Sequence, residues 1–222
     1  MQLQHKNIAF LFLFVWLSFF VCYGQTDVAT SIYGAFGAAT GPTGNNNTVQ
    51  SPSNSAGGLF ELQRIFYPIL GFEVTYSYNR ADQSYNEAFS ATPASVCSPV
   101  PGCPVPLSSP VAVSANEHEF TADWIPSKTT GTLRPFAVLG GGVLLFVPSG
   151  GQSNTTTATK PVFVFGLGMD WARWKRIGLR FQYRGNLYTS PHMLTSYYSN
   201  LTPNDSPMLT NEPMIGVYFR LP

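Results

Sequence analysis

The residues of this chain best suited to chemistry are charged side chains at alternate positions of extended segments. A carboxylate or guanidinium group removed from water must be paired and hydrogen-bonded. The two signs are close to balance, so we expect an internal ion-pair network rather than a catalytic centre, and neither a metal ion nor a cofactor. The expected members are Glu61, Glu73, Glu119, Asp123, Asp170, Arg180, Arg184 and Arg220.

A second candidate centre is His118, which lies between Glu117 and Glu119. A Ser–His–acid group would need these side chains within hydrogen-bond reach, and no serine motif accompanies the histidine. The other histidine after residue 24 is His192. We therefore expect His118 to have no catalytic role, and we expect no catalytic residue elsewhere.

The two cysteines after residue 24 are Cys97 and Cys103, in the segment Cys-Ser-Pro-Val-Pro-Gly-Cys. An even number of closely spaced cysteines in an exported chain favours a local disulfide. A metal site is the alternative, but no histidine or further cysteine lies beside the pair. We expect the bond to limit the disorder of its own loop.

The first 24 residues are predicted to be a cleaved secretory signal peptide. His5 and Lys6 precede an almost wholly apolar run over Ile8–Val21, and Gly24 is the small residue before cleavage. A lipoprotein site at Cys22 and an uncleaved anchor are the alternatives. Removal leaves residues 25–222 as one domain of 198 residues, with 11 basic and 11 acidic side chains. This balance gives no indication of nucleic-acid binding.

The elements that must position the charges are β-strands, and Gly71–Arg80 has the clearest pattern. Phe72, Val74 and Tyr76 fall on one face of this segment, and Glu73 and Thr75 fall on the other. Seven further segments follow the same period with varying clarity. The eight expected strands are Val28–Ala38, Leu59–Ile65, Gly71–Arg80, Glu117–Ile125, Leu133–Phe146, Val162–Trp171, Ile177–Asn186 and Glu212–Leu221.

The strand at 133–146 is the exception, because both of its faces are apolar around Gly140-Gly141-Gly142. Its outward face cannot be assigned from the pattern, and the glycines suggest a bend or a bulge. The remaining segments are expected to be loops. Those at Thr40–Gly58, Ala81–Ala115, Val147–Pro161 and Leu187–Thr210 are long, and the three that alternate with them are short turns.

Eight antiparallel strands of this kind can close into an up-and-down barrel, which leaves no exposed edge. Unlike ends and an apolar, aromatic-rich outer face are typical of transmembrane barrels. A soluble lipocalin-like barrel, with the faces reversed, is the main alternative. Against it, only 10% of residues are charged, and an aromatic girdle is expected beside the short turns. The girdle residues are Phe66, Tyr67, Trp124, Trp171 and Trp174.

The chain end, Gly216-Val217-Tyr218-Phe219-Arg220-Leu221, resembles the insertion signal of outer-membrane barrels, with Gly216, Phe219 and Leu221 at the matching positions. The terminal Pro222 departs from the usual terminal aromatic residue. Together with Gly71–Tyr78, Arg134-Pro135-Phe136 and Phe165–Asp170, it makes residues 25–222 resemble the small outer-membrane β-barrel family that includes the transmembrane domain of outer membrane protein A. These motifs are short and moderately specific.

The resemblance implies an all-β, eight-stranded barrel in the outer membrane, in contact with its lipids and inserted by the barrel-assembly machinery. It does not imply one activity. We expect a structural or adhesin-like role, in which four long extracellular loops on a rigid scaffold bind an unknown extracellular ligand. A narrow, porin-like passage for ions or small apolar solutes, through the interior or a lateral opening, is the first alternative. A lipid A-modifying enzyme, based on His118 alone, is the second.

Overall fold

The computed structural model describes residues 24–43, 47–67, 70–87, 111–151, 154–195, 201 and 203–222. The expected signal peptide, except Gly24, and both cysteines of the expected disulfide lie outside the described residues. In the part of the chain that the structure describes, no helix is long and apolar enough to cross a membrane.

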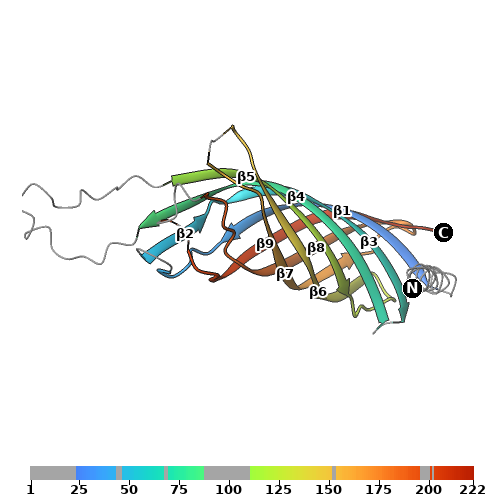
Figure 1. The fold of residues 1–222 in the computed structure, drawn as a ribbon. Helices are drawn as coiled ribbons and strands as arrows, with labels where there is room; N and C mark the ends of the chain where they lie inside the picture. The colour runs from blue at the N-terminus through green and yellow to red at the C-terminus, as the bar shows by residue number, and fades with distance from the viewer. Residues whose placement is uncertain are drawn as a thin grey trace, which may run out of the picture.

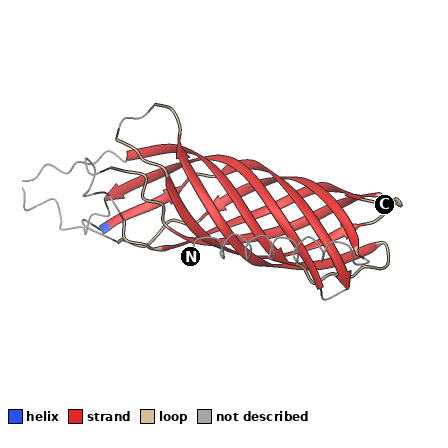
Figure 2. Ribbon diagram, turned by 45° about the vertical axis from the view of Figure 1, so that its right-hand side comes forward, coloured by secondary structure: helices blue, strands red, loops and turns tan. Residues whose placement is uncertain are grey.

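Antiparallel strands make up most of the described chain (Figures 1 and 2). Eight of them, β1, β3, β4, β5, β6, β7, β8 and β9, pair with their neighbours in sequence, and β1 pairs with β9 to close the ring. The predicted eight-stranded up-and-down barrel is therefore confirmed. The strands are β1 (Gln25–Gly37), β2 (Thr48–Pro52), β3 (Ser55–Tyr67), β4 (Leu70–Glu87), β5 (Val111–Trp124), β6 (Leu133–Pro148), β7 (Ala158–Trp171), β8 (Ile177–Thr189) and β9 (Pro207–Arg220).

The short strand β2 lies within a segment that we expected to be a loop, so that prediction is wrong. β2 pairs with the far end of β4, from Thr48 opposite Glu87 to Pro52 opposite Gln83. It continues the line of β3 after a break, where the Ser53 amide donates to the Asp82 carbonyl oxygen at 2.7 Å. β2 lies at the long-loop end, where outward side chains do not need to be apolar. Its sequence therefore lacks the alternation of apolar and polar residues by which the other strands were found.

β4 and β5 are also longer than predicted, because the ends of the expected loop at 81–115 are paired strand. Ala81 lies opposite Ala115, and Tyr85 lies opposite Val111. β9 likewise begins at Pro207 rather than at residue 212. Together with β2, the end of β4 and the start of β5 form a small sheet that continues the barrel wall (Figure 1). We call this sheet, made of residues 48–52, 81–87 and 111–115, the extension.

β6 resolves the face that the sequence left open. Its inward, even-numbered side chains include the buried Phe136 and Phe146, whereas its odd-numbered ones are exposed, as Leu139 is, or half-buried. Both faces are apolar because the interior beside β6 is itself apolar. The register with β5 and β7 runs without a shift through Gly140–Gly142, so the expected bulge is absent. A Cβ at Gly142 would overlap the Phe120 carbonyl oxygen, so close strand approach explains the glycine.

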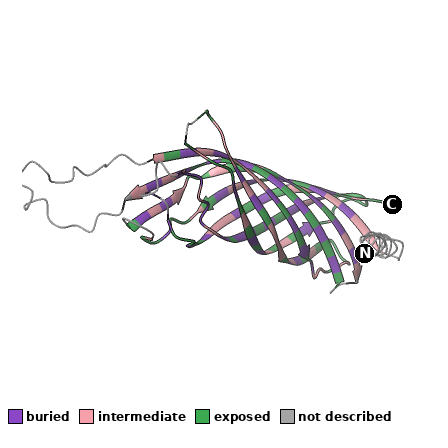
Figure 3. Cartoon of the chain, viewed as in Figure 1, coloured by how far each residue is buried: buried purple, intermediate pink, exposed green. Residues whose placement is uncertain are grey.

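The two ends of the barrel differ. At the short-turn end, the connections cover residues 68–69, 125–132 and 172–176, and this is also where β1 begins and β9 ends (Figure 1). At the opposite, long-loop end, the connections cover residues 38–54, 88–110, 149–157 and 190–206. The connection at 149–157 is barely longer than that at 125–132, so the predicted length contrast fails for this pair. Along most of the eight barrel strands, buried positions alternate with exposed or half-buried ones (Figure 3).

Candidate functional site

Arg180, on the inner face of β8, is the centre of the ion-pair network nearest the short-turn end. Its guanidinium group forms a two-pronged contact with Asp170, from Nε to Oδ1 at 2.8 Å and from Nη2 to Oδ2 at 2.9 Å. Nη1 donates to Glu61 and Nη2 to Gln63, both at 2.9 Å. The guanidinium carbon also lies 4.7 Å from the centre of the Phe136 ring. Arg180 thereby joins β3, β6, β7 and β8 across the lumen.

Arg184, two inward positions further along β8, is the second centre. Its Nη2 donates to Glu119 at 2.9 Å and lies 3.7 Å from Asp123, both on β5. Glu73 on β4 lies between the two arginines, with carboxylate oxygens 3.6 Å from Arg180 Nη1 and 3.8 Å from Arg184 Nη1. Both arginines are completely buried. Their carboxylate partners satisfy buried charges that would be costly if left unpaired.

Seven of the eight charged residues singled out from the sequence thus meet in one network, which we call the arginine network. The eighth, Arg220, lies apart at the short-turn end, where its Nε is 3.6 Å from Asp27. Sequence reasoning missed Asp27, Gln63 and Glu212, although each has the inward parity of its strand. Seven buried carboxylates in the described chain face two fully buried guanidinium groups, so the acid excess is larger than we expected. The carboxylates are those of Asp27, Glu61, Glu73, Glu119, Asp123, Asp170 and Glu212.

At the long-loop end the interior changes from charged to apolar. A cluster of buried apolar side chains extends along β6, from Phe136 beside Arg180 to the mouth, which it fills. Three of its members at the mouth come from the connection between β8 and β9 rather than from a strand. These three are Met193, Leu194 and Leu201. The Tyr85 hydroxyl donates to the Pro191 carbonyl oxygen at 2.8 Å and accepts from the Met193 amide at 3.4 Å. We call the described part of this connection, residues 190–195, 201 and 203–206, the mouth segment.

Side chains therefore fill the lumen at several levels. Three completely buried side chains lie at successive levels from the short-turn end to the long-loop end: Arg180, then Arg184, then Tyr85. In the described residues no three His, Cys, Asp or Glu side chains are arranged as a metal site. The interior is a packed core with charged and apolar zones, as an eight-stranded barrel has room for little else.

The outer wall carries the opposite chemistry. Large apolar side chains are exposed all around it, among them Phe72 on β4, Phe120 on β5, Leu167 on β7 and Ile215 on β9. Such a wall is unsuited to water and suited to lipid hydrocarbon. The face assignment made from the sequence is therefore right, and the lipocalin-like alternative is wrong.

The aromatic residues expected to form a girdle lie toward the short-turn end. Trp124, Trp171 and Trp174 are exposed, and Phe66 is half-buried. The side chain of Tyr67 lies outside the described part. Trp and Tyr favour membrane–water interfaces, so a girdle role remains a proposal for these positions.

His118 lies on the outer wall of β5, closer to the long-loop end. Its Nδ1 is 3.0 Å from the Tyr76 hydroxyl, and its ring centre is 5.2 Å from that of Tyr78. The neighbouring Glu117 and Glu119 occupy the inward positions of the strand, so they cannot complete a Ser–His–acid group with it. The histidine belongs to a polar aromatic patch on the outer wall.

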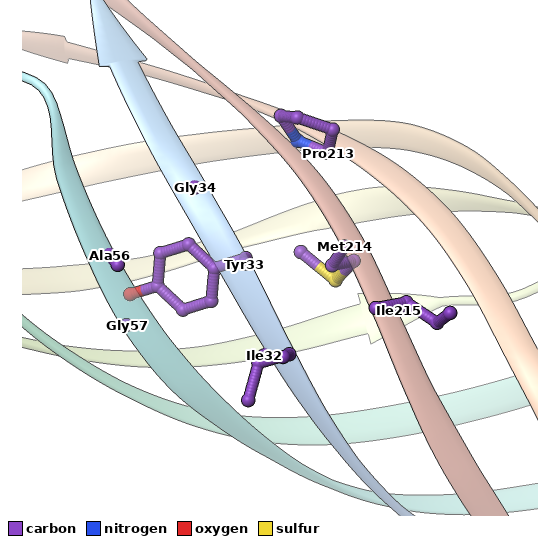
Figure 4. A pocket seen from close by; sticks show the side chains of 8 residues that line it. All are labelled: Ile32, Tyr33, Gly34, Ala56, Gly57, Pro213, Met214 and Ile215. Atoms are coloured by element: carbon purple, nitrogen blue, oxygen red, sulfur yellow. The ribbon is translucent and has the colours of Figure 1, made fainter.

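Between β1, β3 and β9 the outer wall is hollowed by a groove of about 640 Å³ (Figure 4). Gly34, Ala56 and Gly57 line it with small or absent side chains, and the exposed Ile32 and Ile215 also line it. The pairing of β1 with β9 is interrupted between Tyr33–Met214 and Phe36–Asn211. Pro213, which lacks an amide hydrogen, lies in this interval. We call this feature the lateral groove.

The three residues of the expected insertion signal lie at the end of β9 and just beyond it. Gly216 lies opposite Ser31, where a Cβ would overlap the backbone oxygen of Thr30. Phe219 and Leu221 are exposed on the outside. Their use as a signal remains a proposal.

No known protein-family model matches the sequence, and a sequence comparison with characterised proteins gives no match. Solved structures do match. The outer membrane protein OprG from Pseudomonas aeruginosa is 10% identical, with a TM-score of 0.54 over 89% of this chain and 96% of that one. Neisserial surface protein A is 12% identical, with a TM-score of 0.48 over 88% and 97%. The attachment invasion locus protein Ail of Yersinia pestis, in complex with a heparin analogue, is 13% identical, with a TM-score of 0.47 over 90% and 100%.

At these identities the similarity concerns the fold, and the match to OprG is close enough to carry that conclusion. The outer wall adds independent physical support, because its exposed apolar side chains require lipid. A closed barrel satisfies every strand edge, which the hydrocarbon region demands. The chain is a transmembrane β-barrel with the fold of the small eight-stranded outer-membrane proteins, and its location is the outer membrane.

Proposed function

We propose that this barrel is a rigid scaffold that presents its long loops, and above all the extension, to an extracellular partner. The observation that carries this proposal is the extension itself. A barrel that served only to fill the membrane would not need β4 and β5 to stay paired as far as Tyr85 and Val111, with β2 added beside them.

The contacts of the extension make it rigid. Gln50 on β2 donates to Gln83 on β4 at 3.0 Å, and both side chains are buried. Tyr85 ties β4 to the mouth segment through Pro191 and Met193. A binding loop held on a rigid base loses less conformational entropy on association. The connection at 88–110 starts and ends on this base, so it is the segment we expect to bind.

The outer face of the extension has the polarity of an aqueous surface. Arg80, Asp82 and Ser114 are hydrogen-bonding side chains at outward positions, and Ser114 donates to Asp82. Nearer the membrane, the same face carries Tyr76 and Tyr78, which suit the headgroup region. The side chains therefore change from lipid-facing to water-facing along one pair of strands. This supports a long-loop end outside the cell and a short-turn end in the periplasm.

The experiment removes residues 91–109 from the barrel displayed on cells and measures binding to arrays of glycans and matrix proteins. We expect wild-type cells to bind a defined component and the deletion variant to lose it. A matched control deletes residues 152–153 in the β6–β7 connection, which should leave binding intact. Equal binding by wild-type and 91–109-deleted cells would contradict the proposal, provided heat-modifiable gel migration shows that both barrels are folded.

A second candidate function is lateral passage of small apolar solutes, which the lateral groove supports. Tyr33, Leu59 and Met214 form an apolar patch on the inner side of the wall at this groove. Replacing Pro213 by threonine would restore a backbone donor to β9. If solutes leave here, uptake of a small apolar solute by liposomes containing the barrel should fall for Pro213→Thr and not for Pro161→Thr.

We expect no enzymatic activity. The His118 ring points outward, whereas the neighbouring acids Glu117 and Glu119 point into the barrel, so neither can form a Ser–His–acid group with it. The lipid A profile of cells should be the same with and without the protein.

We also propose that the barrel-assembly machinery recognises Gly216, Phe219 and Leu221. Replacing Phe219 by serine should then lower the amount of inserted barrel more than replacing Phe163, which is equally lipid-exposed.

A further inference from the structure

Between the arginine network and the apolar mouth lies a small polar cavity that neither of them explains. Its free volume is about 10 Å³, which is room for one particle the size of a water molecule. Three carboxylates, of Glu117, Glu119 and Glu212, line it. The rest of the lining is Ser77, Asn79, Leu144, Asn186, Tyr188 and Thr210. We call it the carboxylate cavity.

The carboxylates of this cavity are not all neutralised by protein cations. Glu119 is paired with Arg184 at 2.9 Å and also accepts from Asn186 at 2.7 Å. Glu212 is 3% exposed, and in the described chain no Lys, Arg or His side chain lies within 4.0 Å of its oxygens. Glu117 is half-buried and likewise has no cation within 4.0 Å in the described chain; it accepts hydrogen bonds from Asn79 and from Gln83, the latter at 3.3 Å. Leaving the buried Glu212 carboxylate without a cation is costly.

Oxygen atoms in the lining are also left without partners. Within the described residues, Glu212 Oε2, Asn79 Oδ1 and Asn186 Oδ1 are buried and accept no hydrogen bond. The orientation of the Asn186 amide is fixed by chemistry, because its Nδ2 donates to Glu119 and a carboxylate can only accept. Its carbonyl oxygen therefore remains free for another contact. All three side chains are at least nine-tenths buried.

We propose that the carboxylate cavity binds one hard cation of the calcium class. Carboxylate, amide and hydroxyl oxygens are the ligands such an ion prefers. Two unpaired carboxylates match a charge of two, and the cavity admits one ion. Glu117 and Glu212 supply the charge, Asn79 and Asn186 the neutral oxygens. The proposed ligand set therefore combines two carboxylates with two neutral amide oxygens.

The occupied cavity would add β9 to the strands β4, β5 and β8, which Arg184 already connects. Its ligands come from β4, β5, β8 and β9. An ion here would lock the middle of the barrel just below the base of the extension, and Gln83 would transmit this order from Glu117 to Gln50. Calcium should therefore stabilise the folded barrel.

The first test refolds the full barrel in detergent with calcium or with a chelator and measures thermal unfolding by circular dichroism. At calcium 100-fold above Kd we expect the midpoint to rise by about 5–10 °C. Sodium or potassium at the same concentration should have no such effect. No calcium-dependent rise, or an equal rise with sodium or potassium, would overturn the proposal and leave a water molecule as the occupant.

The second test uses terbium, a calcium substitute whose luminescence is excited by a nearby tyrosine. Tyr188 lines the cavity, so the wild-type barrel should sensitise terbium, and calcium should quench this signal by competition. Glu212→Gln should lose most of the signal, while Asp205→Asn, at an exposed acid of the mouth segment, should keep it. Equal signals from both variants would contradict the site. Glu117→Gln replaces Glu212→Gln if the latter fails to fold.

Discussion

Two halves of the barrel interior are filled by different kinds of side chain: the lower half, toward the short-turn end, and the upper half, toward the long-loop end. In the arginine network, charged side chains from five strands meet in fixed hydrogen-bond and ion-pair geometry. In the mouth, apolar side chains pack together, and several belong to the mouth segment rather than to a strand. The first is a property of the barrel wall and cannot open without breaking buried ion pairs. The second is a property of a connection and can open while the wall stays intact.

The largest effect is expected from Arg180→Met. It would leave Glu61 and Asp170 buried without their cation, and removing one partner of a buried ion pair costs ~3–5 kcal/mol. Urea unfolding in detergent, followed by heat-modifiable migration, should show a much lower midpoint. Arg134→Met is the control, since Arg134 is half-buried at the same end and donates to a backbone oxygen of Gly131. Equal urea midpoints for Arg180→Met and Arg134→Met would contradict the claim that the buried ion pairs of Arg180 stabilise the barrel.

The next effect is expected from Met193→Ala in the mouth. Truncating a fully buried methionine costs ~2–5 kcal/mol where the cavity stays open. Because the mouth segment can detach by itself, we expect faster proteolysis within residues 190–206 and little change in the unfolding midpoint of the barrel. Met169→Ala, on the lipid-facing wall, should change neither. A midpoint as low as that of Arg180→Met would mean that the two halves unfold as one unit.

A smaller effect is expected from Tyr85→Phe, which removes one hydroxyl from the junction of the extension and the mouth segment. Two hydrogen bonds are lost, with Pro191 and with Met193, each worth about 1 kcal/mol. Hydrogen exchange should rise in the mouth segment and in the end of β4. Tyr183→Phe removes a hydroxyl from the outer wall and should leave both regions unchanged.

The smallest effect concerns pH at the surface of the mouth segment. The hydrogen bond from Lys160, at 2.7 Å, lowers the pKa of Asp205 below its ordinary value of 3.8. A lowered carboxyl pKa contributes stability above pH 3.8, and this contribution is lost as the pH falls through the lowered pKa. The effect is small because Asp205 is exposed. Proteolysis of the mouth segment should be faster in Asp205→Asn than in wild type at pH 7, and this difference should shrink as the pH falls below 3.8.

The contrast between the two halves also explains what the sequence could predict. Glu73 and Arg180 were identified as inward residues because lipid forces apolar residues to the opposite face of the same strands. The mouth segment and the extension have no such constraint. Tyr85 was assigned to a loop, since its outward neighbours Ser84 and Asn86 are polar and no alternation is visible around it.

Other features depend on distances that no sequence pattern contains. Glu212 has the inward parity of β9 and lies opposite Arg184 on the neighbouring strand β8, but the guanidinium group of Arg184 donates to Glu119 on β5 instead. Gly140–Gly142 was expected to bulge, whereas close approach to β5 explains Gly142. The lateral groove arises where small residues of three strands become neighbours, which requires the register of β1 with β3 and β9.

The central claim is that the interior is closed and that the barrel acts as a scaffold rather than as an aqueous channel. Planar-bilayer recording of the purified protein tests it most directly. We expect no discrete conductance from the wild-type barrel, because Arg180, Arg184 and Tyr85 fill the lumen at separate levels. Stable, discrete conductance steps that change or disappear with Glu73→Gln would contradict the claim and assign the arginine network to an ion path.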